Sequence, residues 1–177
     1  MSNLSKGRQE PRRTRRGEAR DTLLRARAAE LFLERGFEGV TVDDIVREVG
    51  GSKGSVYSFY GGKDGLFLAA MDDTVLDLTS PLKRLKLSGL SLEQGLTKFA
   101  EMLLSIVLEE PHLAFQRLVI AETLRHPQVG LSWYRHGSSA ARAILERFLA
   151  EQQAAGSAKQ GGQRHRPAIG AKTRAHR

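Results

Sequence analysis

Residues 41–63 have the sequence TVDDIVREVGGSKGSVYSFYGGK, and this stretch decides the fold expected for the N-terminal part of the chain. Thr41 occupies a favourable helix N-cap position, and the acidic Asp44 three residues later resembles the second half of a capping box. Gly50 and Gly51 end this first helix, because glycine adopts the backbone conformations that a tight turn needs. The pattern therefore predicts a short helix over residues 41–49, followed by a turn.

A second short helix follows the glycine pair. Ser52 is a favourable N-cap, and the helix is expected from Lys53 to about Phe59, where Gly61-Gly62 ends it. Two short helices joined by a tight turn are the plan of a helix-turn-helix motif, whose second helix enters the DNA major groove. The competing interpretation is an ordinary interhelical turn, with the aromatic residues between 57 and 60 in the core.

The second helix is about 10 Å long at ~1.5 Å per residue, so only its first turn is expected to reach base edges. There Lys53 is placed to donate to guanine, and Gly54 lets the backbone approach the bases closely. Val56 is expected to face the same groove and to contact a thymine methyl. Tyr57 and Lys63 are expected at phosphates.

Helical periodicity continues on both sides of this motif. Before it, Leu24, Ala28 and Leu31 recur on one face, and Gly36 ends the pattern. After it, apolar stripes predict helices over about 63–78, 92–109 and 112–124, a short segment around 133–137, and a further helix through 141–148. Sustained strand alternation between hairpin turns is absent from the sequence. The expected fold class is all-α.

The positive charge lies at the two ends of the chain. The formal net charge is +8, with +5 in residues 1–20, +6 in residues 155–177, and −3 between them. Basic arms suit a polyanionic partner, although a solvated tail has the same composition. Residues 1–17 and 156–177 lack apolar periodicity, so both are expected to be disordered.

Several function classes are disfavoured by the sequence. The chain has no cysteine, which excludes disulfides and thiolate chemistry, and its histidines show no metal-ligand spacing, so neither a metal nor a cofactor is expected. The longest apolar run, Leu66 to Met71, is too short to span a bilayer. The first twenty residues lack the apolar core of a signal peptide, so a cytoplasmic protein is expected. Catalytic motifs are also missing, since Ser138-Ser139 lacks a nucleophile elbow.

Three segments together resemble the TetR family of transcriptional regulators. They are AAELFLERGF at 28–37, TVDDI at 41–45 and GSVYSFYGGKDGL at 54–66. Their order and spacing match the family over about residues 18–74. The later segments FQRLVIAE at 115–122, His126-Pro127 and Trp133-Tyr134 with Gly137 are similar to the C-terminal domain of AefR-like regulators, over about residues 91–155.

This resemblance implies a DNA-binding domain over residues 18–78 and a helical domain for ligand and dimer contacts over residues 79–155. It implies a homodimer that represses transcription from a palindromic operator, and a small-molecule inducer that moves the helix starting at Lys63. Carried over position by position, the DNA-facing residues are Thr41, Ser52, Lys53, Gly54, Ser55, Tyr57, Phe59 and Lys63.

The chain departs from the family pattern at four places. Phe59 stands where relatives often have His or Tyr, so this position cannot supply the phosphate hydrogen bond that those residues make. The hydroxyl of Tyr60, which stands where Phe is usual, is a candidate to make that bond instead. Gly51 replaces a small apolar residue in the turn. Beyond Ala155, a basic segment replaces a helical stretch that helps to build the family's dimer interface.

An inducer pocket is expected in the second domain. Its candidate lining residues are the large side chains on the apolar stripes, together with one acid: Phe99, Met102, Leu103, Ile106, Phe115, Leu118, Val119, Glu122 and Trp133. Such stripes are more often core than ligand contacts, and Glu122 and Arg117 also suit a surface salt bridge.

Three functions from different classes remain open at this point. The first is a ligand-responsive DNA-binding repressor, in which the arm arginines and Lys63 neutralise phosphates and residues 53–56 discriminate between sequences. The second is a non-specific nucleic-acid binder driven by the two basic ends. The third is a helical small-molecule-binding module without a DNA function.

Overall fold

The computed structural model describes residues 15–163, and every regular element in this range is helical. The predicted all-α class is confirmed. In chain order the elements are α1 (Arg15–Arg35), α2 (Val42–Val49), α3 (Lys53–Tyr60), α4 (Lys63–Leu78), α5 (Ser80–Lys83), α6 (Leu92–Val107), α7 (Glu110–Glu122), α8 (Pro127–Trp133), the π-helical turn η1 (Tyr134–Ser138) and α9 (Ser139–Gln163).

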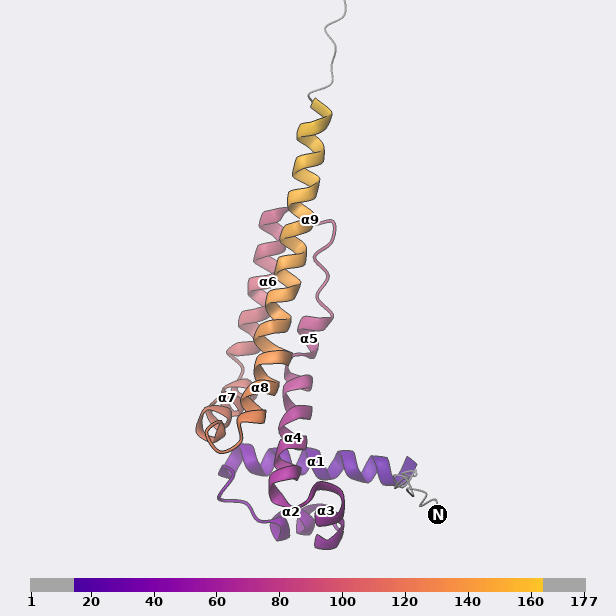
Figure 1. The fold of residues 1–177 in the computed structure, drawn as a ribbon, viewed down its shortest axis with the longest axis vertical. Helices are drawn as coiled ribbons and strands as arrows, with labels where there is room; N and C mark the ends of the chain where they lie inside the picture. The colour runs from indigo at the N-terminus through magenta and orange to yellow at the C-terminus, as the bar shows by residue number, and fades with distance from the viewer. Residues whose placement is uncertain (1–14, 164–177) are drawn as a thin grey trace, which may run out of the picture.

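The helices form a small base and a tall column (Figure 1). At the base α1 lies across the molecule, with α2 and α3 beneath it. Helix α4 rises from α3 toward α5 and connects the base to the column, in which α6 and α9 run side by side. At the foot of the column, α7 contacts α4 and α6, and α8 contacts α4 and η1. We call α1–α4 the base domain and α5–α9 the upper domain.

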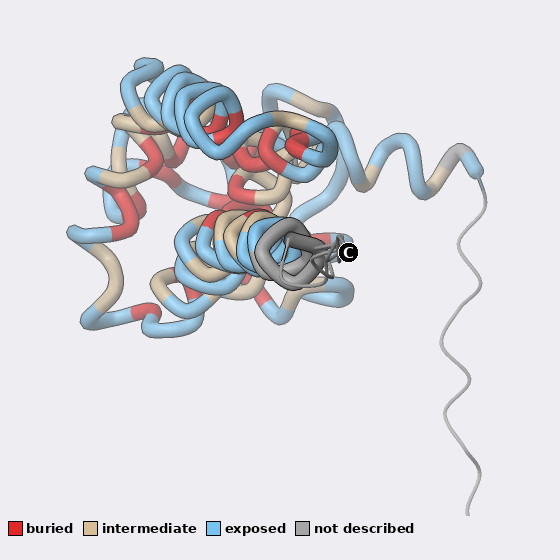
Figure 2. Tube along the Cα trace, turned by 90° about the horizontal axis from the view of Figure 1, so that it is seen from above, coloured by how far each residue is buried: buried red, intermediate tan, exposed pale blue. Residues whose placement is uncertain are grey.

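Two hydrophobic clusters hold these parts together. The larger one joins the base to α7 and α8, and includes the fully buried Phe32, Ile45, Phe67 and Phe115. The smaller one lies in the column and includes Leu82, Leu85, Phe99, Ile106, Ala141 and Phe148. Figure 2 shows the buried residues on the helix faces that turn inward, with exposed residues outside. Most helices therefore bury the apolar stripe that their sequence carries, whereas α6 leaves Leu92 and Leu96 exposed.

Helix limits follow from capping residues and prolines. Ser91 begins α6 with a capping box, in which its hydroxyl accepts from the N–H of Gln94 and the Gln94 side chain accepts from the N–H of Ser91. Pro81, Pro111 and Pro127 each lie in the first turn of a helix, where a missing N–H costs nothing. The predicted helix over about residues 63–78 is confirmed, because α4 spans Lys63–Leu78.

Three predicted boundaries are corrected by the structure. Helix α1 begins at Arg15, inside the predicted arm. Gly137 does not end a helix, because the chain passes through η1 directly into α9. Helix α9 continues to Gln163, past the predicted boundary at Ala155, because extending an existing helix through residues such as Ala and Gln needs no new nucleation. The remainder of both predicted disordered ends, residues 1–14 and 164–177, lies outside the described residues.

Candidate nucleic-acid interface

The first helix of the motif is fixed at its start by a capping box. The hydroxyl of Thr41 accepts from the N–H of Asp44 at 3.2 Å, and Asp44 Oδ2 accepts from the N–H of Thr41 at 2.9 Å. The Thr41 hydroxyl also donates to the same carboxylate oxygen at 2.6 Å. This side-chain hydrogen bond, followed by the backbone one, lowers the pKa of Asp44 from its ordinary value. The predicted N-cap at Thr41 is confirmed.

The turn between α2 and α3 depends on glycine and on a residue of α1. Gly50 and Gly51 have positive φ values of 68° and 151°, which disfavour any residue with a Cβ. Arg20 donates from Nη2 to the carbonyl oxygen of Gly50 at 2.7 Å. This bond ties the turn between α2 and α3 to α1. The sequence pattern does not reveal Arg20, because it lies 30 residues away from the carbonyl that it binds.

The first turn of α3 is exposed, as predicted. Ser52 caps the helix by accepting from the N–H of Ser55 at 3.2 Å, and the two hydroxyl oxygens lie 3.0 Å apart. A Cβ built on Gly54 would meet only Ser52 Oγ, at an ordinary 3.7 Å. The packing around Gly54 would therefore leave room for a side chain. Because glycine has none, nothing projects from the outer surface of α3 at this position. Tyr57 and Phe59 are more than half exposed.

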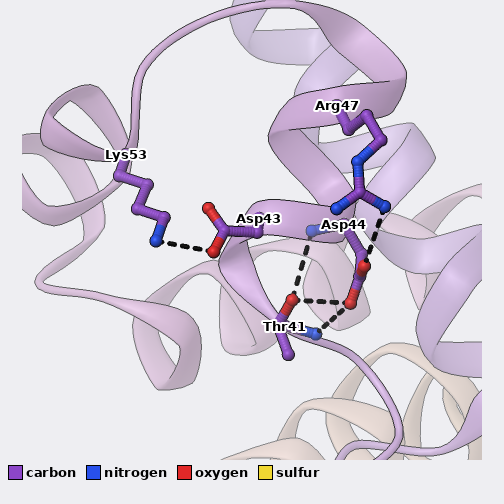
Figure 3. A network of polar contacts seen from close by, with 5 residues as sticks. All are labelled: Thr41, Asp43, Asp44, Arg47 and Lys53. Carbon is purple, nitrogen blue, oxygen red and sulfur yellow. Dashed lines mark hydrogen bonds and ion pairs between the residues drawn. The ribbon is translucent and has the colours of Figure 1, made fainter.

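Lys53 forms an ion pair that the sequence pattern does not predict (Figure 3). Its Nζ lies 2.6 Å from Oδ2 of Asp43, in the first turn of α2. The two side chains are 57% and 50% exposed, so the pair sits at the surface and links the two helices of the motif. In the same view Arg47 pairs with Asp44 at 3.3 Å. The i to i+10 separation of Asp43 and Lys53 gives no local sequence signal for this contact.

Two predicted interface residues occupy other positions. Val56 is 1% exposed and belongs to the larger hydrophobic cluster, so the prediction that it contacts a thymine methyl is wrong. It lies on the inward face of α3, three residues along the helix from Lys53. Tyr60 is half-buried, and its hydroxyl donates to Asp21 of α1. This hydroxyl therefore ties α3 to α1, whereas the sequence suggested that it binds a phosphate in place of residue 59.

Lys63 begins α4 next to the motif and is half-buried. Its Nζ lies 4.1 Å from the centroid of the Phe37 ring, a cation–π contact that holds the ammonium near the end of α3. The close approach of α3 and α4 needs glycine, since a Cβ on Gly65 would lie 1.8 Å from the carbonyl oxygen of Tyr60. Lys63 is thus positioned by packing as well as by its place in the sequence.

The same corner joins the base to the upper domain. The buried His126, just before α8, packs with its ring centroid 4.6 Å from that of Phe37 and 5.1 Å from that of Phe67. Its Nε2 lies 3.7 Å from an Asp64 carboxylate oxygen. Arg125, its neighbour, forms an ion pair with Glu38 of the base domain. These contacts connect the segment between α7 and α8 to the loop after α1 and to the first turn of α4.

The predicted pocket residues are divided between the two hydrophobic clusters. Phe99 and Ile106 are buried in the column, where Met102 and Leu103 pack against the same cluster. Phe115, Leu118 and Val119 are buried in the larger cluster, against which Trp133 packs. Glu122 is half-buried at the end of α7, and Arg117 pairs with Glu110 at 2.5 Å on the surface.

Three hollows lie in the described part of the chain, and the predicted inducer-pocket residues line none of these three. The largest, about 510 Å³, lies between α1, α2 and α3, and the others lie beside α9 and between α4 and α8. Within residues 15–163, no cluster of His, Asp and Glu could hold a metal ion. In the same range no helix has the length and apolar content needed to cross a bilayer.

Comparisons with known proteins match both halves of the chain. Residues 24–70 match the model for bacterial regulatory proteins of the tetR family, and residues 94–161 match the C-terminal domain of AefR-like transcriptional repressors. The chain belongs to the TetR family. This family consists of transcriptional regulators and not of enzymes. The second match extends past Ala155, in agreement with the observed length of α9.

A curated relative is a transcriptional repressor. The chain is 30% identical over 123 residues to the HTH-type transcriptional repressor AcnR of Corynebacterium diphtheriae, covering 68% of this chain and 59% of that protein. It therefore spans less than two thirds of the length of this curated relative.

Solved structures share the fold. One, described as a TetR-family transcriptional regulator from Mesorhizobium loti MAFF303099, is 26% identical with a TM-score of 0.63, covering 81% of this chain and 72% of that one. Another, the flavonoid-responsive regulator FrrA, is 28% identical with a TM-score of 0.65, covering 78% of this chain and 70% of that one.

Proposed function

We propose that this TetR-family chain is a sequence-specific DNA-binding transcriptional repressor, which binds a palindromic operator as a homodimer and releases it in response to a small molecule. The observation that carries the proposal is the exposed first turn of α3, presented by a motif that α1 holds in place through Arg20. Duplex DNA is the partner that such a surface fits, because a helix of this size enters the major groove end-on. The protein would meet that DNA in the cytoplasm.

Base recognition is assigned to the start of α3. Lys53 and Ser55 supply hydrogen-bonding groups for base edges, and Gly54 lets the helix backbone approach. Thr41, Ser52, Tyr57 and Lys63 surround this turn as candidates for phosphate contacts, with the exposed ring of Phe59 beside them. Phosphate contacts set the register of the protein on the duplex, whereas base contacts carry the sequence preference.

Ligand response is assigned to the upper domain and its contact with α4. Flavonoid response belongs by name to the regulator FrrA, and we infer only a small organic ligand for this chain. The contact of His126 with Phe37 and Phe67 gives α7 and α8 a route to the first turn of α4, where Lys63 lies. A ligand that shifts α7 or α8 would therefore change the position of the DNA-binding surface.

The test is selection from a library of random-sequence DNA duplexes with the full-length protein. We expect enrichment of a palindromic sequence, and a relaxed preference at one base pair of each half-site in Lys53→Ala. A variant lacking residues 1–14 and 164–177 should keep the preference, because the motif lies outside those segments. Binding that needs these basic ends and selects no sequence would replace the proposal with a non-specific nucleic-acid binder. Absence of DNA binding would leave a ligand-binding module without a DNA function.

A further inference from the structure

The ion pair between Asp43 and Lys53 places a carboxylate at the DNA-facing surface, where phosphates would repel it. Asp43 lies in the first turn of α2 and is half exposed. Asp43 takes no part in capping the helix, because the capping box is formed by Thr41 at the N-cap and Asp44 at position N3. A helix N-terminus favours an acid in general, but the Asp43 carboxylate binds a lysine of the next helix.

We propose that Asp43 is a specificity-determining residue, which holds the Lys53 ammonium so that it donates to a base and not to a phosphate. This inference rests on the proposed function of α3. An ammonium has three N–H donors, so Lys53 can keep Asp43 as one acceptor and offer the others to a guanine edge. Because the pair is electrically neutral, it adds little electrostatic binding energy to a duplex that lacks the matching base.

The chemistry of the site favours this division of roles. Lys63 is a second lysine beside α3, and its Nζ lies over an aromatic ring, where no carboxylate of residues 15–163 forms an ion pair with it. It keeps its full charge for phosphates. Lys53 is compensated by a carboxylate 2.6 Å away, on the helix that precedes the turn. Lys63 is therefore suited to phosphates, which every DNA sequence presents. Lys53 is held by Asp43 and is suited to a base, which differs from one sequence to another.

The consequence for binding is a lower affinity for non-specific DNA. If Asp43 lost its charge, Lys53 could neutralise an additional phosphate and release an additional counterion. One such contact raises the affinity for DNA about five- to tenfold near 0.1 M salt. It also steepens the slope of log affinity against log salt concentration by about 0.9. This gain applies to every sequence. The preference for the selected sequence over random DNA would fall, because the lysine no longer depends on a base.

The experiment measures the affinity of full-length Asp43→Asn for two probes across salt concentrations. The probes are the duplex selected by the wild-type protein and a random-sequence duplex of equal length. We expect random DNA to bind about five- to tenfold more tightly and its salt slope to increase by about 0.9, with a smaller gain for the selected duplex. Circular dichroism and thermal unfolding verify that this isosteric surface variant is folded.

Matched variants separate the ion pair from general electrostatics. Glu48→Gln removes the same charge from an exposed position on α2 and should change both affinities alike. Asp43→Glu keeps the carboxylate and should retain the wild-type preference for the selected duplex. In a Lys53→Met background, Asp43→Asn should change the affinities for both probes alike, as Glu48→Gln does, because no ammonium is freed and only the relief of repulsion remains.

Two results would overturn the inference. One is an equal effect of Asp43→Asn and Glu48→Gln on the preference, and the other is an effect of Asp43→Asn on the preference that persists without Lys53. If the wild-type protein selects no sequence at all, the proposed function fails instead. The two failures are therefore distinguishable within the same set of measurements.

Discussion

The base domain and the column differ in how completely a single chain covers their apolar side chains. In the base, Phe32, Ile45, Phe67 and Met71 are buried by four helices together with α7 and α8. In the column, α6 packs on α9 but leaves Leu92, Leu96 and Leu104 exposed, and Leu108 directly after the helix is exposed as well. The apolar core of the base domain is thus covered by helices of the same chain, whereas the column leaves apolar side chains of α6 exposed to solvent. The difference is consistent with a base that recognises DNA and an upper domain that forms the proposed homodimer.

The strongest test of this comparison truncates one apolar side chain in each region. Phe67→Ala should lower the free energy of unfolding by about 3–5 kcal/mol, because it leaves a cavity among Phe32, Phe37 and His126. Leu104→Ala, at an exposed position of α6, should change it by about 0.5 kcal/mol or less at a protein concentration where the chain is monomeric. Urea unfolding followed by circular dichroism measures both. Equal losses would contradict the difference in burial.

A glycine in the column gives a test of its packing. Gly95 of α6 lies against Phe148 of α9, and a Cβ there would lie 2.0 Å from the ring. Gly95→Ala should therefore destabilise the protein by about 1–3 kcal/mol through overpacking. Gly156→Ala on α9 is the control, since a Cβ there meets nothing within 4 Å, and it should be neutral or slightly stabilising. A loose column would tolerate both substitutions equally.

Within the base domain, two lysines should affect DNA binding in different ways. Lys53→Ala should reduce discrimination at one base pair per half-site by about 1–3 kcal/mol. Lys63→Ala should weaken all sequences alike and flatten the logarithmic salt slope by about 0.9, because the protein then neutralises one phosphate fewer. Affinities for the selected duplex and its single-base variants, measured at several salt concentrations, distinguish the two. Identical losses without a change in preference would show that the assigned roles are wrong.

The smallest expected effect concerns His112 of α7, which lies between the two regions. Burial lowers the pKa of His112 from its ordinary value, so the unfolded chain takes up a proton at a higher pH than the folded protein does. Stability should therefore fall as the pH is lowered through about 6.5, the value for an unperturbed histidine. Urea unfolding at pH 7.5 and 5.5 should show a smaller loss for His112→Leu than for the wild-type protein. An unchanged loss would assign the pH dependence to other groups.

The sequence predicts the elements of the motif better than the orientation of its residues. Thr41 and Ser52 are recognisable as caps because their partners lie three residues away, within reach of a local pattern. The prediction for Val56 chose the wrong face because a helix of eight residues is too short for periodicity to distinguish its two sides. The roles of Arg20 and Asp43 escape prediction because their partners lie elsewhere in the chain.

The proposed inducer pocket shows the same limit in the upper domain. The apolar stripes of α6 and α7 are correctly placed on helices, yet Phe99 and Phe115 belong to different clusters. Periodicity indicates which face of a helix is apolar but not which neighbour covers it. The lining of a ligand site in this chain therefore stays a prediction.

By itself, the sequence determined the all-helical class, the longer helices and the two N-caps of the motif, because these depend on residues within about one helical turn. Only the tertiary structure decided that Lys53 is paired, that Tyr60 binds α1 and that His126 joins the two domains. Each of these contacts unites residues that are distant along the chain, and it forms only once the apolar faces of the helices have packed.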